Sequence, residues 1–484
     1  MTANYAEFLE RKTQRGAMTG FDPLWMPDFL FDFQQYLVDW AIRMGRAAIF
    51  ADCGLVKTPM QLVWAENVAR KTNGNVLILT PLAVSRQLAM EGDKFGIEVG
   101  VSRDGKPAGH ITAMNYERLH KADASDYVAV VCDESSVLKH WSGHTQKAVT
   151  RFVSKMPYRL LCTATPAPND FVELGTSSEA LGYLTHSAML ETFFRQMSDD
   201  EKKKKATKSD IIHSKRLSWR VIQSIGQWCL KAHAFEPFWK WVSSWSRACR
   251  KPSDLGLYDD SRFVLPPLNR IDHMIVPPPP PGFLFTLPAF GLNQEREERR
   301  RTIGQRADLT ASLVAANGST EPYIIWCQLN DEADAIADRL ADAVQVKGSQ
   351  SIDHKEELLT AFLTGESRGL VTKAKIAGLG LNMQHCAHVI TFVDHSYEKF
   401  YQAIRRCWRF GQKRPVRLDV IATEGEINVK RNMDRKQAMA EQMFDAIISF
   451  MNESQQITNA IPKQRIEVPT WLQNAASPLS SIVH

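Results

Sequence analysis

The amino-acid sequence predicts an α/β fold with two doubly wound parallel-sheet lobes and a helical insertion between them. Short apolar runs rich in β-branched residues alternate with helical patterns, which is typical of parallel sheets. The runs fall into two sets, and a segment rich in tryptophan separates them. The predicted strands are 47–51, 76–80, 127–132 and 158–163 in the first set, and 323–327, 369–372, 388–393 and 416–422 in the second.

Length and composition place the chain among ordinary globular proteins. Its 484 residues suffice for two or three domains of roughly 150 residues each. Hydrophobic residues make up 44% and charged residues 23%, which excludes a wholly disordered or fibrous chain. The net charge of +5 is compatible with a nucleic-acid partner but does not indicate one.

The expected compartment follows from cysteine usage and hydropathy. No apolar run approaches the roughly 18 residues of a membrane helix, and residues 1–16 contain no apolar signal region. The eight cysteines include no Cys-x-x-Cys pair, so neither a zinc finger nor a redox motif is indicated. We therefore expect a cytoplasmic protein with small, buried, reduced cysteines and no membrane partner.

The chain divides into five predicted segments. They are an N-terminal extension (1–28), a first lobe (29–180), a helical Trp-rich insertion with a proline linker (181–281), a second lobe (282–425), and a C-terminal helix and tail (426–484). Two amphipathic helices are predicted outside the lobes: one in the insertion, packed on a lobe, and one near the C-terminus, packed on the second lobe. Their apolar stripes are Phe238, Trp241, Trp245 and Cys249 in the first, and Met439, Met443, Ile447 and Met451 in the second.

A strand, a turn and a helix start follow one another at 47–58, the order that a phosphate-binding loop requires. Backbone N–H groups of such a loop, here including Gly54 and Leu55, face phosphate oxygens at the start of a helix. Lys57 is placed to reach the β and γ phosphates, and Thr58 is placed to bind Mg²⁺. The loop therefore predicts binding of ATP with Mg²⁺.

The phosphate loop departs from the G-x-x-x-x-G-K-[ST] pattern at both glycines. Ala51 fills the first glycine position and Val56 the second. The second glycine lets the backbone approach the phosphates closely, and a β-branched residue tolerates unusual φ angles poorly. We therefore expect Val56 to weaken or abolish nucleotide binding.

Paired carboxylates end the apolar run at 128–132. Asp133 at a strand tip can hold Mg²⁺ through water, and Glu134 can orient the attacking water as a general base. A lone Asp-Glu pair is usually a solvated surface feature. Its position after a buried strand, downstream of a Lys-Thr phosphate loop, favours a catalytic role.

A remote helical stretch at 402–412 places Gln402, Arg406 and Arg409 on nearby faces. Arg405, Arg406 and Arg409 are candidates for contacting phosphates in the transition state. An arginine supplied from the second lobe would make hydrolysis depend on closure of the lobes. Standing alone, this stretch would be interpreted as a solvated basic helix.

These three pieces, in this order, resemble the superfamily 2 helicases, and among them the Swi/Snf-type DNA translocases and the DEAD-like helicases of phages. The resemblance runs from about residue 29 to residue 422. It implies two RecA-like lobes that hold ATP and Mg²⁺ in their cleft and nucleic acid across their tops. It also implies a DNA partner, with duplex favoured, protein partners from phage or host, and the cytoplasm of a bacterial or phage-infected cell.

Further motifs carry the resemblance on the nucleotide side. The run at 33–36 resembles the glutamine motif of this family, in which Gln34 would read the adenine edge. The run at 377–384 resembles motif V, and the arginine stretch resembles motif VI. The resemblance implies that Gly380 and Gln402 contact the nucleotide.

Other motifs line the nucleic-acid track in this family. The runs at 80–87 and 111–119 resemble motifs Ia and Ib, which line this track, and the run at 163–169 resembles motif III, which couples hydrolysis to strand contacts. The residues that the resemblance places on nucleic acid are Thr80, Arg86, Asn115, Thr163 and Asn382. For the lysine run at 202–205, a solvated loop is favoured over contact with DNA phosphates.

Two other functions stay open from sequence. Val56 favours a nucleic-acid-binding protein with a weakened ATP site, and RNA unwinding is a further alternative to movement along DNA. Ser136 also stands where a histidine often follows the paired carboxylates in this family. The connection from the ATP site to nucleic acid is therefore expected to differ.

Overall fold

The computed structural model describes residues 18–81, 84–139, 143–198, 224–225, 228–280, 282, 288–289, 292–377 and 382–459. The lysine run at 202–205 and Gly380 lie outside these residues, as do 1–17 of the predicted N-terminal extension and the tail from 460 onward.

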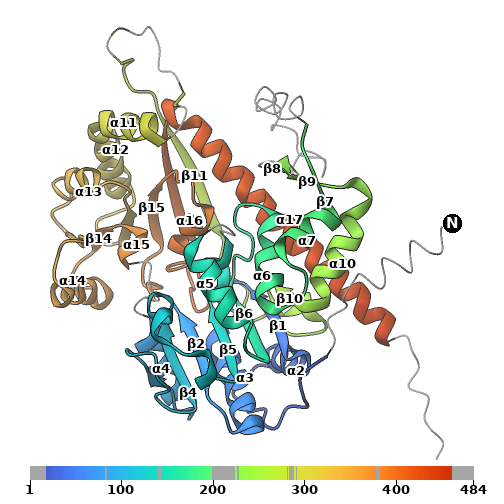
Figure 1. Cartoon of the computed structure of the whole chain (residues 1–484). Helices are drawn as coiled ribbons and strands as arrows, with labels where there is room; N and C mark the ends of the chain where they lie inside the picture. The colour runs from blue at the N-terminus through green and yellow to red at the C-terminus, as the bar shows by residue number, and fades with distance from the viewer. Residues whose placement is uncertain are drawn as a thin grey trace, which may run out of the picture.

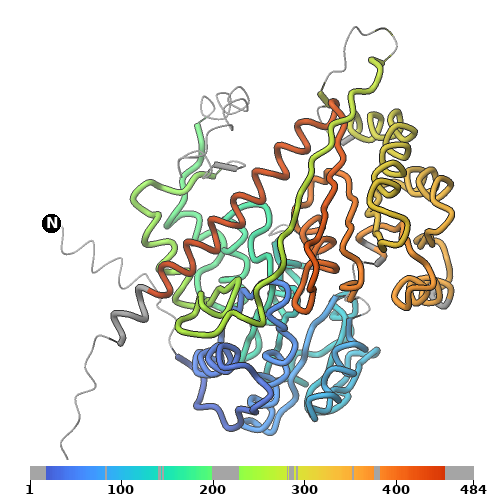
Figure 2. The backbone as a smooth tube through the Cα atoms, turned by 180° about the vertical axis from the view of Figure 1, so that it is seen from behind, coloured from blue at the N-terminus to red at the C-terminus, as the bar shows by residue number. Residues whose placement is uncertain are grey.

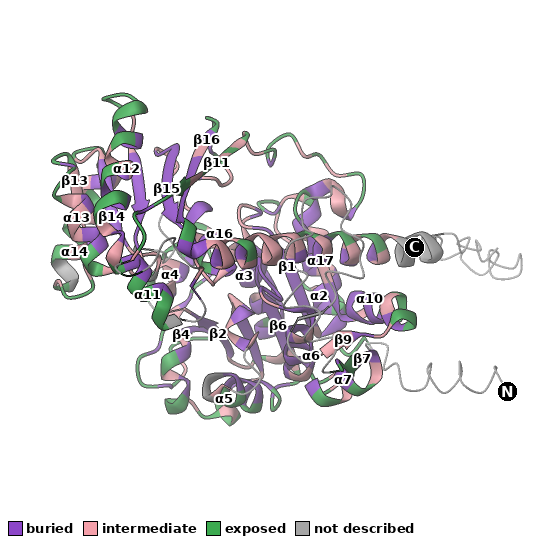
Figure 3. Cartoon of the chain, turned by 90° about the horizontal axis from the view of Figure 1, so that it is seen from above, coloured by how far each residue is buried: buried purple, intermediate pink, exposed green. Residues whose placement is uncertain are grey.

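Lobe 1 is built on a seven-stranded sheet in which every pair of neighbouring strands is parallel (Figure 1). In sheet order the strands are β10 (Ser246–Cys249), β1 (Arg46–Ala51), β6 (Tyr158–Cys162), β5 (Ala129–Asp133), β2 (Val76–Thr80), β4 (Ile111–Asn115) and β3 (Gly100–Val101). Alternate residues of β1 enter different cores: Phe50 joins one and Ile49 the other. Both faces of the sheet are therefore covered, which explains why its strands read as continuous apolar runs (Figure 3).

Lobe 2 is built on a six-stranded sheet that is also parallel throughout. In sheet order its strands are β11 (Leu268–Ile275), β16 (Val416–Thr423), β15 (His388–Phe392), β12 (Tyr323–Trp326), β14 (Gly369–Thr372) and β13 (Ala343–Gln345). The predicted α/β class with two RecA-like parallel-sheet lobes is confirmed. Every predicted strand is present, and β3, β4, β10, β11 and β13 extend the two sheets.

Helices surround each sheet. In lobe 1 they are α2 (Asp32–Met44), α3 (Lys57–Thr72), α4 (Val84–Lys94), α5 (His144–Val153) and α6 (Leu174–Leu181), with short 3-10 helices η1 (Tyr116–Lys121), η2 (Ala124–Asp126), η3 (Ser135–Lys139) and η4 (Phe171–Glu173). In lobe 2 they are α11 (Leu292–Arg301), α12 (Ile303–Ala316), α13 (Asn330–Ala337), α14 (Ile352–Thr364), α15 (Ala374–Ala377), α16 (Tyr397–Ile404) and η8 (Glu424–Glu426). Among the described residues, no helix has the length and apolar character needed to cross a bilayer.

The segment between the lobes contributes a strand to each sheet. Its own elements are α7 (His186–Phe193), an antiparallel sheet of β7 (Phe194–Gln196), β9 (Trp228–Leu230) and β8 (Ser224–Ile225), then η6 (Ala232–Ala234), α10 (Phe235–Trp245) and η7 (Pro252–Leu255). Helix α10 is the predicted amphipathic helix, and it buries Phe238, Trp241 and Trp245 in a core of lobe 1. The spacing of Cys249 predicted that it lies on this helix, and that prediction was wrong. Cys249 instead ends β10, which pairs with β1 and extends the sheet.

The last helix, α17 (Ile427–Asn459), joins the two lobes (Figure 2). Its first turns bury Val429 and Met433 in a core of lobe 2. The predicted stripe instead enters the two cores of lobe 1. Its residues are Met439, Met443, Ile447 and Met451. Packing of the stripe on the second lobe was therefore a wrong expectation. A helix of 33 residues is about 50 Å long at 1.5 Å per residue, so α17 reaches across to α10.

We predict that Ile447→Ala lowers the free energy of unfolding by about 2–5 kcal/mol, because it leaves a cavity where the side chain is fully buried. Urea titration followed by tryptophan fluorescence measures the effect. Ser449→Ala, on the exposed side of the same helix, is the matched control. Equal stability of the two variants would show that α17 does not pack on lobe 1 in solution.

Candidate active site

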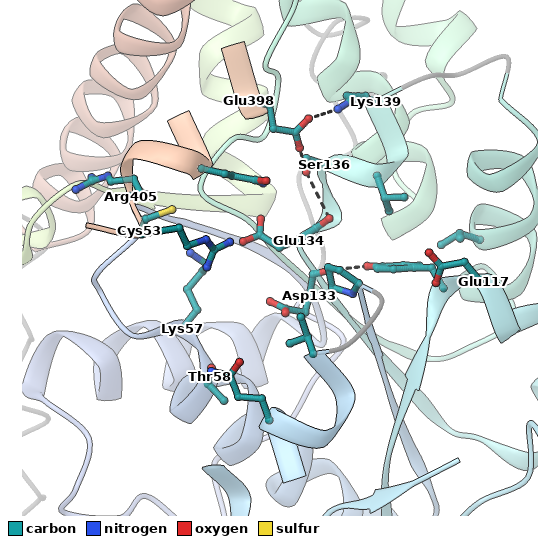
Figure 4. A pocket seen from close by; sticks show the side chains of 18 of the residues that line it. Cys53, Lys57, Thr58, Glu117, Asp133, Glu134, Ser136, Lys139, Glu398 and Arg405 are labelled. Carbon is teal, nitrogen blue, oxygen red and sulfur yellow. Dashed lines mark hydrogen bonds and ion pairs between the residues drawn. The ribbon is translucent and has the colours of Figure 1, made fainter. Parts of the chain in front are cut away.

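One crevice lies between the carboxyl ends of the lobe 1 strands and helix α16 of lobe 2 (Figure 4). Its volume is about 880 Å³, which falls in the range of about 300–1,000 Å³ that is usual for small-molecule sites. The predicted residues that line it are Gly54, Val56, Lys57, Thr58, Asp133 and Glu134 from lobe 1, and Gln402, Arg405, Arg406 and Arg409 from lobe 2. The structure thus brings the three remote sequence motifs together.

The phosphate loop holds a side chain in a strained backbone conformation. Val56 has φ 52° and ψ 69°, in the left-handed region that glycine adopts freely. For a β-branched residue this conformation costs on the order of 1–3 kcal/mol. Gly54 has φ 109°, and an added Cβ there would lie 3.1 Å from the Phe410 nitrogen of lobe 2. The loop therefore needs glycine at 54 and carries strain at 56.

The Gln34 side chain is hydrogen-bonded to the backbone of this loop. Its Nε2 donates to the carbonyl oxygens of Leu55 at 3.0 Å and Val56 at 3.1 Å, and its Oε1 accepts from the Phe31 nitrogen at 3.1 Å. The side chain is buried at 1% exposure. Both amide donors are engaged with the backbone, so reading an adenine edge, the role expected for Gln34, would require these bonds to be exchanged.

Lys57 and Thr58 begin α3 directly after the strained residue. The Lys57 Nζ donates to the Ala51 carbonyl oxygen at 3.1 Å. Burial acts to lower the pKa of Lys57, but nearby groups, including the carboxylates of Glu134 and Asp133, outweigh it and raise the pKa. Lys57 is therefore a fixed cation inside the crevice.

The paired carboxylates face Lys57 from the end of β5 (Figure 4). Gln61 Nε2 donates to Asp133 Oδ1 at 2.7 Å, which fixes one oxygen of that carboxylate. Burial and repulsion from Glu134 raise the pKa of Asp133 to about 6. Glu134 has φ 48°, a second strained position, and its Oε2 accepts from the Thr163 hydroxyl at 3.3 Å.

The donor set fits a magnesium–nucleotide complex. Thr58 offers a hydroxyl and Asp133 a carboxylate, on the same side of the crevice as Lys57. Mg²⁺ is usually held by one or two carboxylates together with substrate phosphates, not by a dedicated protein cage. In line with this, the described part of the chain contains no group of three or more His, Cys, Asp or Glu side chains that could hold a metal alone.

The arginines of lobe 2 have different surroundings. Arg406 lines the crevice, and its Nε is buried without a hydrogen-bond partner. Burial lowers the pKa of Arg406, and Arg409 beside it adds to the effect. Arg405 instead forms an ion pair with Asp52 of the phosphate loop. Arg406 and Arg409 are therefore the better candidates for an anion in the crevice.

Ser136 provides a second contact between the lobes. Its hydroxyl donates to one oxygen of Glu398 on α16, and the Lys139 ammonium pairs with the other oxygen (Figure 4). Glu398 is buried, at 8% exposure. Ser136 thus connects the segment after the paired carboxylates to lobe 2.

The residues predicted to touch nucleic acid do not all reach the surface. Thr80 and Thr163 are fully buried, so neither contacts a polynucleotide in this conformation. At the ends of buried strands their hydroxyls bond to protein partners instead. Asn115 is half-buried, and Arg86 and Asn382 are exposed.

Some residues of the site were not identified from sequence. Gln61 follows Thr58 by three positions on α3, and Glu398 precedes Gln402 by four on α16. This spacing puts each on the face of an already identified residue, so helical periodicity contained a signal for both. The contact of Tyr401 with Asp52 crosses the lobe interface and had no local signal.

Comparison with known proteins agrees with this geometry. Residues 305–411 match the family described as helicase conserved C-terminal domain. The chain is 29% identical over 117 residues to the TATA-binding protein-associated factor mot1 of Aspergillus fumigatus, a match that covers 22% of this chain and 6% of that protein. It is 25% identical over 173 residues to the putative ATP-dependent helicase/translocase YwqA of Bacillus subtilis, covering 33% of this chain and 18% of that protein.

These matches support a superfamily 2 helicase or translocase family for the chain. The matched C-terminal helicase domain contains α16 and the arginines after it, which face the crevice. The curated relatives are matched over only a small part of their length. The phosphate loop lies outside the matched helicase domain.

We predict that replacing Val56 strengthens nucleotide binding in the order Val, Ala, Gly. Glycine relieves the left-handed strain and should lower the dissociation constant about tenfold, equivalent to about 1.4 kcal/mol. Alanine removes the β-branch but keeps a Cβ, so its effect should be intermediate. Titration of a fluorescent ATP analogue in Mg²⁺ measures the series, and equal constants for all three would refute strain as the cause.

Proposed function

We propose that the protein is an ATP-driven motor of the Swi/Snf type that couples ATP hydrolysis to movement along DNA, with duplex favoured. The observation that carries the proposal is the shared crevice, in which Lys57 and Glu134 of lobe 1 face Arg406 of lobe 2. Groups from two lobes around one site make hydrolysis sensitive to lobe closure. The Arg-x-Gly-Gln sequence at 409–412 supports the Swi/Snf type.

Each residue has a distinct role in this proposal. Lys57 binds the β and γ phosphates, and Thr58 and Asp133 hold Mg²⁺, which neutralises charge on the phosphates when it is bound. Glu134 orients the attacking water and accepts its proton. Arg406 and Arg409 stabilise the negative charge of the transition state from lobe 2.

Contact with DNA would be mainly electrostatic. Motors that follow a phosphate backbone bind without reading sequence, and their affinity falls steeply with salt. Arg86 and Asn382 are exposed and remain candidates for this contact. Protein partners from phage or host belong to the same proposal, as does a cytoplasmic site of action.

A second candidate function is a nucleic-acid-binding protein with a weakened ATP site. The left-handed conformation of Val56 favours it, because the loop is strained where the family uses glycine. RNA unwinding is distinguished from both by the choice of nucleic acid in the assay.

We predict that ATP turnover is stimulated by duplex DNA more than by single strands or RNA. Lys57→Ala should reduce stimulated turnover by about 100-fold or more, the usual scale for one preorganised electrostatic group. Lys106→Ala, an exposed lysine outside the crevice, is the matched control and should retain turnover. Phosphate release at two salt concentrations measures both effects.

Turnover that is absent in the natural chain but appears in Val56→Gly would instead support the second candidate function. Stimulation by RNA above that by duplex DNA would favour RNA unwinding.

A further inference from the structure

Asp52 is an acidic residue inside a loop built to hold anions. It follows β1 directly, and its side chain is only 13% exposed. Two groups from lobe 2 reach its carboxylate: Arg405 Nη2 pairs with Oδ2, and the Tyr401 hydroxyl donates to Oδ1. A buried carboxylate beside a phosphate site needs such compensation, because its charge would otherwise repel the phosphates.

On the lobe 1 side, Asp52 organises the turn that leads to Val56. Its Oδ1 accepts from the Cys53 nitrogen at 2.6 Å, and its carbonyl oxygen accepts from the Leu55 nitrogen at 3.2 Å. Its own nitrogen donates to the Cys249 carbonyl oxygen at 3.0 Å. The position of this one residue therefore sets the path of the phosphate loop.

On the lobe 2 side, Arg405 fixes the turn that carries the crevice arginines. Its Nε and Nη2 lie 3.0 and 2.9 Å from the Tyr401 hydroxyl oxygen, and its Nη1 donates to the Trp408 carbonyl oxygen at 3.3 Å. The guanidinium also lies 4.5 Å from the centre of a Trp408 ring. All three nitrogens of Arg405 are therefore bound to protein groups. In Arg406, by contrast, the Nε has no hydrogen-bond partner.

We propose that Arg405 is a positioning residue that, through Asp52, ties the shape of the phosphate loop to closure of the lobes. When the lobes are closed, Arg405 and Tyr401 neutralise and hold Asp52, and the loop keeps the conformation that binds phosphates. When they separate, Asp52 becomes an uncompensated anion in the loop, and the loop relaxes. By linkage, phosphate binding then favours closure to the same degree.

This coupling rests on the proposed function, but its test does not require turnover. The full chain without nucleotide is examined by hydrogen exchange with mass spectrometry, using Arg405→Gln, Tyr401→Phe and, as the matched control, Arg414→Gln. Arg414 forms an ion pair with Glu321 within lobe 2, and both are exposed. We expect loop amides 52–58 to exchange about tenfold faster in Arg405→Gln, and less so in Tyr401→Phe, with no change in Arg414→Gln.

A double variant tests the charge argument. Arg405→Gln should weaken binding of a fluorescent ATP analogue about tenfold, and adding Asp52→Asn should recover part of the loss, because the uncompensated anion is then removed. A purely structural role predicts additive losses. Unchanged loop exchange in both Arg405→Gln and Tyr401→Phe, or a double variant weaker than Arg405→Gln alone, overturns the proposal.

If Arg405→Gln does not fold, Tyr401→Phe alone decides the exchange test, since it removes one hydroxyl from the cluster. A chain without stimulated turnover whose loop exchange still responds as expected would refute the proposed function and leave the positioning role standing.

Discussion

The crevice depends on helix α16 being seated against lobe 1 at both of its ends. Near its start Glu398 contacts Ser136 and Lys139, which follow the paired carboxylates, and just after its end Arg405 contacts Asp52 in the loop between β1 and α3. A helix is stiff, so two anchored ends fix everything between and immediately beyond them. Gln402 lies on this helix and Arg406 follows its end by two residues, so the anchoring brings both to the crevice.

Backbone strain is concentrated on the lobe 1 wall of the same crevice. Val56 and Glu134 both have positive φ; Val56 directly precedes Lys57, and Glu134 directly follows Asp133. Such conformations persist only where neighbours over-determine them. Gln34 holds the carbonyl of Val56, and Thr163 holds the carboxylate of Glu134. Residues that were expected to touch adenine and nucleic acid therefore act in this conformation as supports of the site.

The sequence allowed the fold class, the strands and the main residues of the crevice to be predicted, because each depends on a local pattern. Apolar runs mark buried parallel strands; Lys57 begins the helix after one of them, and Asp133 is the last residue of another. The unusual φ expected at Val56 is present, because it is a property of one position in the loop.

What could not be predicted depends on contacts between distant segments. The sequence around Cys249 has helical spacing, yet it pairs as a strand because the edge of β1 is available to it. The apolar stripe of α17 would suit packing on either lobe, and only the three-dimensional path of the helix decides which core it enters. Likewise, no local pattern joins Asp52 to Tyr401 and Arg405, because the pairing exists only at the lobe interface.

The route of α17 also has a consequence during biosynthesis. Domains usually fold in order as they leave the ribosome, the N-terminal one first. Here the core of lobe 1 is completed by Met443 and Ile447, which follow all of lobe 2 in the chain. When lobe 1 leaves the ribosome, the apolar surface of α10 that α17 covers is therefore still exposed. It is covered only after lobe 2 and α17 have been translated.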